Sequence, residues 1–184
     1  MIASLHGTIR LRESRAIVVS VGGIGWRVFV GSRVLKQAEG ETVDLYTHLH
    51  VGGDGMDLYG FATPDELGLF ESLIRVAGVG PKSALAILSE TPSAEVRNAI
   101  ISADTVPLMR ASGIGKKTAE RIILELSGTL LSNKISASDE AIDALERLGY
   151  TRREANEAMS QVDTSIRDVR ERIRAALRTL SKRP

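Results

Sequence analysis

Hydrophobic and polar residues alternate along the first sixty residues in short runs that glycines interrupt. The runs are rich in β-branched residues, which favour strands. They read IASLHGTIR, AIVVSV, GWRVFV, TVDLYTHLHV and DLYGF. Glycine-rich turns, GGIG at 22–25 and GGDG at 52–55, join neighbouring runs tightly, which is typical of hairpins. The pattern predicts five strands that close into a small antiparallel barrel over residues 1–63.

The apolar period changes to 3.6 after residue 63, which indicates helices. Thr63 is a suitable N-cap, Pro64 suits the first helical position, and the acidic residues Asp65 and Glu66 favour the first turn. Short turns separate the segments with helical periodicity. We expect helices over 64–76, 81–89, 92–102, 105–111 and 116–130.

Residues 132–138, SNKISAS, are small and polar without periodicity, so we expect a flexible linker there. The segment 139–184 then predicts three amphipathic helices, opened by serine or threonine. The fold class is therefore a multidomain α+β protein. Its parts are an N-terminal five-stranded barrel that resembles an OB-fold (1–63), a central all-helical domain (64–131), the linker (132–138) and a C-terminal three-helix module (139–184).

The composition of the 184-residue chain excludes several classes of protein. Without cysteine it forms no disulfide and no thiolate metal site, and no apolar run approaches the ~18 residues of a membrane span. The N-terminus lacks the apolar block of a secretory signal. We expect a soluble, cytoplasmic protein. Its net charge is only +1, so any binding of anions must depend on local arrangement.

A sequence in the helical part occurs twice, as GVGPKSALAIL at 78–88 and as GIGKKTAERII at 113–123. Aligned with an offset of 35 residues, the copies match beyond the glycines. The matched pairs include Leu73 with Leu108, Gly78 with Gly113, Gly80 with Gly115, Lys82 with Lys117, Ala84 with Ala119 and Ile87 with Ile122. Each copy predicts a helix, a Gly-hydrophobic-Gly turn and a second helix. We call residues 78–83 the first hairpin and 113–118 the second hairpin.

Such a turn is suited to binding anions. Glycines expose their N–H groups, and the following helix begins with unpaired N–H donors and a partial positive charge. We expect Val79 and Ile114 to anchor the turns in the core. Lysine and arginine side chains add positive charge: Lys82 in the first hairpin, with Lys116, Lys117 and Arg121 at or after the second. The richer set of charges predicts that the second hairpin binds DNA more strongly.

One copy alone is compatible with an ordinary turn between two helices, but two copies that keep the lysine favour a ligand with repeated phosphates. Paired helix-hairpin-helix units bind the backbones of duplex DNA across the minor groove and do not read its sequence. Neither copy has the spacing of a P-loop or of a dinucleotide-binding fingerprint, and no strand precedes either.

The order of these parts, with LYGF closing the barrel, then LFESLIRVAGVGPKSALAIL and GIGKKTAERIILEL, closely resembles the RuvA family over essentially the full chain. The resemblance implies a homotetramer, or an octamer of two tetramers on DNA, that binds four-way (Holliday) junction DNA in an open, square planar form. It implies that a separate AAA+ ATPase, RuvB, binds residues 139–184 and drives branch migration in recombination and DNA repair, with RuvC as the resolvase.

The resemblance also assigns roles to residues of this chain. It implies that the barrel mediates tetramerisation and that both hairpins bind DNA phosphates. The implied DNA-binding residues are Gly78, Val79, Gly80, Lys82, Gly113, Ile114, Gly115, Lys116, Lys117 and Arg121. The family has an acidic pair at the last barrel hairpin, a pin at the junction centre. Here HVGGDGMD retains only Asp54 of that pair, so each subunit contributes a single acid to the pin.

Other arrangements keep two alternatives open. His48 and His50 share a strand face near Asp44 and Asp54, but the spacing fixes no third metal ligand, and we expect no metal site and no cofactor. No cluster of three carboxylates indicates a nuclease, and Glu120 and Glu125 suit an exposed helix face better than glycosylase catalysis. We predict a non-catalytic DNA-binding subunit. The alternatives are a helix-hairpin-helix nuclease or glycosylase, and an architectural protein that binds any duplex.

Overall fold

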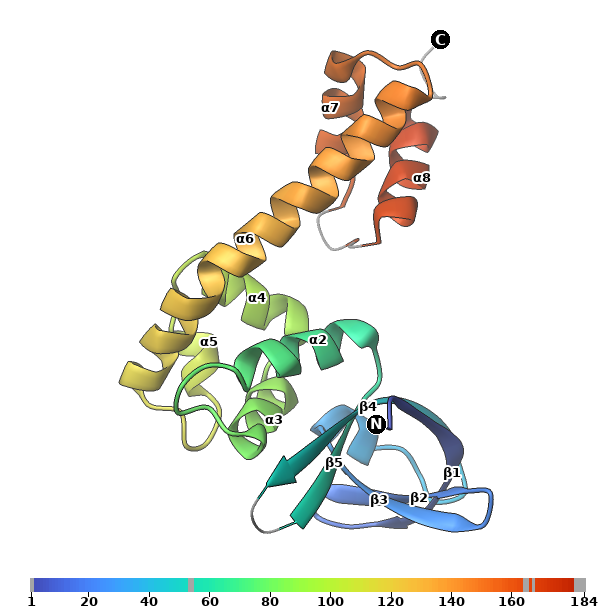
Figure 1. Cartoon of the computed structure of the whole chain (residues 1–184), viewed down its shortest axis with the longest axis vertical. Coiled ribbons are helices and arrows are strands. Elements are labelled where there is room, and N and C mark those ends of the chain that lie inside the picture. The colour runs from blue at the N-terminus through green and yellow to red at the C-terminus, as the bar shows by residue number, and fades with distance from the viewer. Residues whose placement is uncertain (1, 53–54, 164–165, 167, 181–184) are drawn as a thin grey trace. The chain divides into compact units, whose positions relative to one another are not determined.

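The computed structural model describes residues 2–52, 55–163, 166 and 168–180, and for 131–140 it describes the backbone alone. The chain divides into two units, Met1–Ser127 and Gly128–Pro184. The first contains the barrel and the repeated hairpins, and the second contains the C-terminal helices (Figure 1).

Five strands form a closed barrel at the N-terminus, as predicted, in the spatial order β1-β2-β3-β5-β4. They are β1 (Ser4–Arg12), β2 (Ala16–Val21), β3 (Ile24–Val30), β4 (Thr42–Gly52) and β5 (Gly55–Phe61). A two-residue turn joins β2 to β3, and its glycines Gly22 and Gly23 have φ values of 57° and 85°. Such left-handed positions match the twist of a tight hairpin.

The barrel is not purely antiparallel, contrary to our prediction. β3 and β5 pair in parallel, with Val28 opposite Leu58 and Val30 opposite Gly60. The reason is geometric, because strand direction cannot alternate all the way round a ring with an odd number of strands. A short helix, α1 (Ser32–Leu35), follows β3 before the chain returns along β4. The sequence pattern did not indicate this helix.

Five helices follow the barrel, and all five segments that we predicted as helices are helical. They are α2 (Pro64–Leu73), α3 (Pro81–Glu90), α4 (Ser93–Ile101), α5 (Val106–Met109) and α6 (Lys116–Arg147). The Thr63 hydroxyl accepts a hydrogen bond from the Glu66 backbone N–H at 3.2 Å, which confirms the predicted N-cap.

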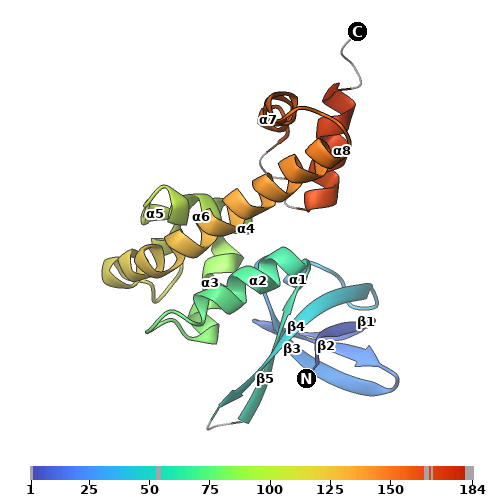
Figure 2. The same cartoon turned by 45° about the horizontal axis from the view of Figure 1, so that its top comes forward.

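Helix α2 packs on an outer face of the barrel through aromatic contacts. The Phe70 ring of α2 lies 5.3 Å from the Tyr59 ring and 4.7 Å from the Phe61 ring, centroid to centroid. His48 of β4 contacts the same ring and lies 3.1 Å from the Glu71 carboxylate through Nδ1. These contacts fix the β4–β5 hairpin against the helices, and that hairpin extends beyond the rest of the barrel (Figure 2).

Helix α6 continues through residues 132–138, where we expected an irregular linker. The segment SNKISAS contains neither glycine nor proline, and helix-breaking residues are absent from Thr129 to Leu148. Small polar residues tolerate a helix when helix-forming sequence flanks them on both sides. The boundaries of the four predicted segments stay predictions.

In the second unit, the end of α6 packs with α7 (Arg152–Ser160) and α8 (Val169–Leu180). Ala141, Leu145, Ala155 and Ala176 are completely buried in their common core. Thr151 and Glu154 form a capping box at the start of α7. The predicted three-helix module is therefore present, with its first helix continuous with α6.

Candidate nucleic-acid interface

The turns of the two hairpins have the same backbone conformation. Gly78 and Gly113 both have φ of 86°, in the left-handed region that favours glycine. The hydrogen bonds around the turns also correspond at the 35-residue offset. They run from Val79 N–H to Val76 O and from Ile114 N–H to Ala111 O, then from Ala84 N–H to Gly80 O and from Ala119 N–H to Gly115 O. The sequence repeat is thus a structural repeat.

The residue between the two glycines anchors each turn, as predicted. Val79 and Ile114 are only 4% and 6% exposed. The residues around them are buried in matched pairs: Leu73 with Leu108, Ala84 with Ala119, and Ile87 with Ile122. Because these apolar side chains point inward, the glycine backbones lie at the surface, where a Cβ atom at Gly80, Gly113 or Gly115 would meet open space.

The helix that follows each turn presents backbone N–H donors at its start and has no acidic residue in its first turn. Gly80 is the N-cap of α3 and has no side-chain capping bond, and neither α3 nor α6 has an acidic residue in its first turn. The N–H groups of these first turns therefore have no carboxylate competing for them, and the helix dipole makes them positive. One donor is missing from the first hairpin, because Pro81 has no N–H.

The three predicted lysines are exposed beside these helix starts. Lys82 follows the first turn, and Lys116 and Lys117 begin α6. The Lys116 ammonium lies 3.9 Å from the Glu120 carboxylate, but its side chain is 75% exposed, so the pair leaves its charge accessible to an anion. Backbone donors and lysines therefore converge at both turns.

Arg121 lies elsewhere than its place in the sequence indicated. Although it follows the second hairpin along the chain, it donates a hydrogen bond from Nη1 to the Ala77 carbonyl at 3.0 Å, beside the first hairpin. A Cβ at Gly78 would lie 3.6 Å from the same nitrogen. Arg121 therefore joins the two hairpins and adds its charge to the edge of the first.

The predicted pin residue, Asp54, lies outside the described residues. The strands that flank it are described, and Gly52 pairs with Gly55 at the end of the β4–β5 ladder. The role of Asp54 stays a prediction.

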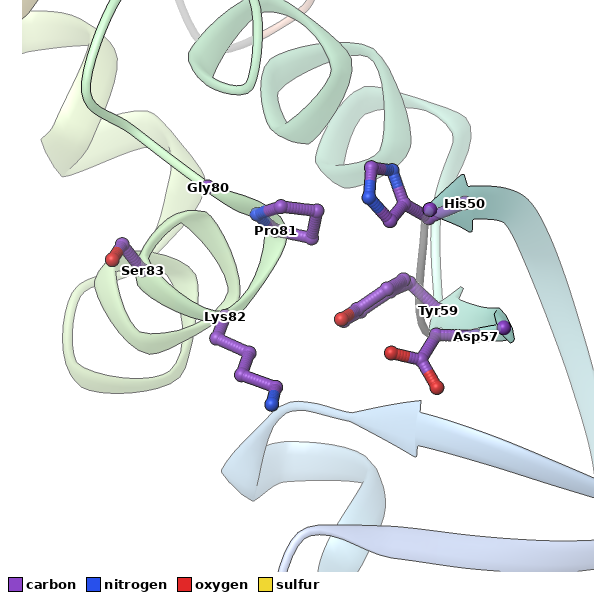
Figure 3. A pocket seen from close by; sticks show the side chains of 9 residues that line it. His50, Asp57, Tyr59, Gly80, Pro81, Lys82 and Ser83 are labelled. Carbon is purple, nitrogen blue, oxygen red and sulfur yellow. The ribbon is translucent and has the colours of Figure 1, made fainter.

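Sequence reasoning missed a group of polar residues opposite the first hairpin. His50, Asp57 and Tyr59 of the β4–β5 hairpin line a groove of about 380 Å³, and the residues from Gly80 to Ser83 line its other side (Figure 3). Tyr59 is 1% exposed, and burial, followed by the nearby Asp57 carboxylate, raises the pKa of its hydroxyl. The alternation of β4 and β5 placed these residues on one face, but the sequence did not indicate which helix would face them.

The three histidines have different surroundings in the described residues. His6 contacts Asp44 at 2.6 Å, His48 contacts Glu71, and His50 faces the groove. Across the residues that the structure describes, no group of three histidine, aspartate or glutamate side chains is placed to hold a metal ion. Within the same residues, no helix has the length and apolar character needed to cross a membrane.

A barrel that leads into two helix-hairpin-helix units with exposed amides and lysines defines a tandem helix-hairpin-helix protein. Family comparisons agree and are more specific. Residues 1–60 match the RuvA N terminal domain, 70–127 match the SAM-like helix-hairpin-helix tandem, and 136–181 match the RuvA C-terminal domain.

Curated relatives match along the whole chain. One from Herpetosiphon aurantiacus is 40% identical over 96% of this chain and 97% of its own length. Another, from Tropheryma whipplei, is 41% identical over 99% of both. A third, from Caldanaerobacter subterraneus, is 40% identical over 99% of this chain. All three are named Holliday junction branch migration complex subunit RuvA. The chain belongs to the RuvA family.

Proposed function

We propose that this protein binds four-way (Holliday) junction DNA and serves as the non-catalytic DNA-binding subunit of a branch migration complex. The observation that carries the proposal is the pair of matching hairpins, each with exposed glycine backbones, a helix start and exposed lysine. The relatives named as branch migration subunits match this chain over nearly its full length. The function places the protein in the cytoplasm, in recombination and repair of DNA.

The hairpins bind phosphates and not bases. Backbone N–H groups and lysines recognise the oxygen atoms that every nucleotide carries, so these contacts position the protein without reading sequence. Two equivalent turns on one compact unit contact the two strands of a duplex arm. Junction selectivity therefore has to come from the number and the arrangement of the arms that are bound together.

That arrangement requires several copies of the chain. We propose a tetramer assembled through the barrels, with one subunit on each arm and with Asp54 of each copy near the crossover. Four carboxylates around a symmetry axis would repel phosphates there even with one acid per subunit. The unit that contains α7 and α8 binds the motor, a RuvB-type ATPase on a separate chain. A RuvC-type resolvase acts on the same junction.

Equilibrium binding at one fixed salt concentration tests the proposal, because phosphate-dominated affinity falls steeply with ionic strength. The two DNAs are a four-way junction and a linear duplex with the same sequences in its arms. Simultaneous contact with four arms predicts binding to the junction about a hundredfold tighter or more. Equal affinities would instead favour an architectural duplex-binding protein.

The catalytic alternative needs a separate assay. Incubation of the pure protein with end-labelled junction and Mg²⁺ should leave every strand intact. Cleavage that persists after further purification, or release of a free base, would replace the proposal with a nuclease or a glycosylase.

A further inference from the structure

The groove of about 380 Å³ beside the first hairpin has features that phosphate binding does not use. One wall is the outer part of the β4–β5 hairpin and the other is the start of α3, both within the unit Met1–Ser127. Figure 3 shows side chains from both walls directed into the same space.

The Tyr59 hydroxyl is a donor on a buried side chain and has no partner among the described residues. Tyr59 is 1% exposed, and its ring packs between Phe29 and Phe70 at centroid distances of 5.5 and 5.3 Å. Its hydroxyl points into the groove. A phenol is protonated at neutral pH in any case, and burial raises the pKa of Tyr59 further, so the hydroxyl retains its donor. Because the hydroxyl opens onto the groove, an acceptor atom of a ligand can reach it.

Two opposite charges face the groove without neutralising each other. Asp57 lies beside Tyr59 on β5, and Lys82 extends from the start of α3 on the other side. Neither forms an ion pair within the described part of the chain. A phosphate alone does not suit this groove, because the Asp57 carboxylate repels it. A ligand that has both hydrogen-bond donors and acceptors suits it better.

Rings lie on both sides of the groove. Figure 3 shows the His50 imidazole and the Tyr59 ring on the β4–β5 side and the Pro81 ring on the side of α3. His50 is opposite Asp57 in the β4–β5 ladder, so one cross-strand pair supplies a ring and a carboxylate. Nucleobases combine a flat face that stacks with an edge that has both donors and acceptors.

The groove is continuous with the first phosphate-binding turn, since Gly80, Lys82 and Ser83 belong to both. A nucleotide whose phosphate lies at the start of α3 would therefore have its sugar and base next to the groove. Within a duplex that base is paired and stacked. At the crossover of a junction, however, bases change partners during branch migration and are transiently unpaired.

We propose that this groove binds one unpaired nucleobase from the strand whose phosphate is held by the first hairpin, with Asp57 and Tyr59 hydrogen-bonded to its edge and His50 stacked on its face. The proposal rests on the junction binding proposed above. The β4–β5 hairpin, next to the crossover, then binds a base while that base exchanges its old pairing partner for its new one.

The test is a double-mutant cycle between protein and DNA, which isolates a pairwise contact. The full-length protein is compared with the variant His50→Ala/Tyr59→Phe, which keeps an aromatic ring buried in the same place and loses only the hydroxyl there. Each is titrated with an intact junction and with junctions that have an abasic nucleotide, in turn, at the crossover position and the next two positions of every strand. An abasic site also removes a base pair from the DNA itself, but that effect is the same for both proteins and therefore cancels in the cycle.

If a base occupies the groove, its removal should weaken binding of the unmodified protein about tenfold more than binding of the variant, at one of the three positions, as expected for one stacked and hydrogen-bonded base. Asp57→Asn should show a smaller coupling at the same position. Equal ratios for both proteins at all three positions would overturn the proposal. A coupling with abasic sites ten base pairs into the arms would overturn it too, because bases there are paired.

Two controls separate this proposal from the proposed function and from misfolding. Lys117→Ala, in the second hairpin, should weaken binding to intact and abasic junctions by the same factor. The affinities of the same proteins for junction and for linear duplex are measured in parallel. If the unmodified protein prefers the junction but shows no coupling to an abasic site, the base-binding groove alone is rejected. If the unmodified protein does not prefer the junction, junction binding itself is rejected. Thermal unfolding of the variants should show a transition like that of the unmodified protein, which checks that the barrel remains folded.

Discussion

In the first hairpin, Gly80 lines the barrel groove and a Cβ at Gly78 would contact the Arg121 guanidinium, whereas a Cβ at Gly113, the equivalent of Gly78, would meet open space. Both turns have the same φ value and corresponding hydrogen bonds. The repeat therefore determines the backbone of each turn, while residues outside the repeat determine its surroundings.

This comparison changes the basis on which we expected the second hairpin to bind DNA more strongly. That expectation counted Arg121 with Lys116 and Lys117, but Arg121 contacts the first hairpin at the Ala77 carbonyl. The first hairpin thus has Lys82 and Arg121 nearby, and the second has two lysines, one of them close to Glu120. The order of strength stays a prediction, and it now depends on the N–H that Pro81 lacks.

Truncation of the buried anchors should have the largest effect on stability. Ile114→Ala should lower the free energy of unfolding by about 3 kcal/mol, and Val79→Ala by about 1 kcal/mol less, because valine has one methylene fewer to lose. Urea denaturation followed by circular dichroism measures both. Leu124→Ala is the matched control, since Leu124 is 81% exposed and should lose almost nothing. A loss below about 1 kcal/mol for Ile114→Ala would contradict the role of the anchors.

Removal of the lysines should have the largest effect on DNA binding. Each phosphate contact contributes a factor of about eight at 0.1 M salt, so for each subunit bound to DNA the variant Lys116→Ala/Lys117→Ala should weaken binding roughly sixtyfold and Lys82→Ala about eightfold. The slope of log affinity against log salt should fall by about two units and about one unit per bound subunit, respectively. Fluorescence anisotropy over a salt series measures both. A loss that depends on DNA sequence would be inconsistent with phosphate contacts.

Gly78 and Gly113, the equivalent hairpin glycines with positive φ, provide a direct test of backbone equivalence. Gly78→Ala and Gly113→Ala should each lower the free energy of unfolding by about 1 to 2 kcal/mol, because both force alanine into a left-handed conformation. Since a Cβ at Gly78 meets Arg121 only at an ordinary contact distance of 3.6 Å, the two losses should agree. Losses that differ by more than about 1 kcal/mol would show that the turns are not equivalent.

Arg121→Lys should have the smallest effect on stability, because it removes only the hydrogen bond to the Ala77 carbonyl beside the first hairpin. Lysine keeps the charge but loses the guanidinium bond to Ala77, so the free energy of unfolding should fall by about 0.5 to 1 kcal/mol, with the salt slope unchanged. Arg75→Lys serves as control, because the exposed Arg75 side chain has no hydrogen bond with a described residue. A changed salt slope for Arg121→Lys would mean that a lysine cannot replace the arginine at a phosphate.

Local patterns predicted most of this fold. The five strands, the Thr63 cap and both glycine turns could be read from the sequence, because each depends on a few neighbouring residues. The parallel β3–β5 pair could not be found in this way, since it follows from closing the barrel. The helix through 132–138 was missed because small polar residues are typical of linkers and are also tolerated in helices.

The candidate site was predictable where it lies within the repeat and not where distant segments meet. The glycines and lysines of both hairpins were identified from their spacing. In contrast, the contact between Arg121 and Ala77 spans 44 positions, and the groove brings β5 against the start of α3. Nothing in the local sequence of Tyr59 indicates that its hydroxyl would open onto the first hairpin.

The Arg121 bond to Ala77 also bears on what kind of duplex the protein tolerates. By linking one turn to the helix that follows the other, it adds to the buried anchors in limiting how far the separation of the two turns can change. The width of the DNA minor groove, in contrast, varies with sequence and is smallest in A-tracts. Arms whose groove does not match this separation would have to deform on binding, so a protein that reads no bases would still bind some sequences less tightly than others.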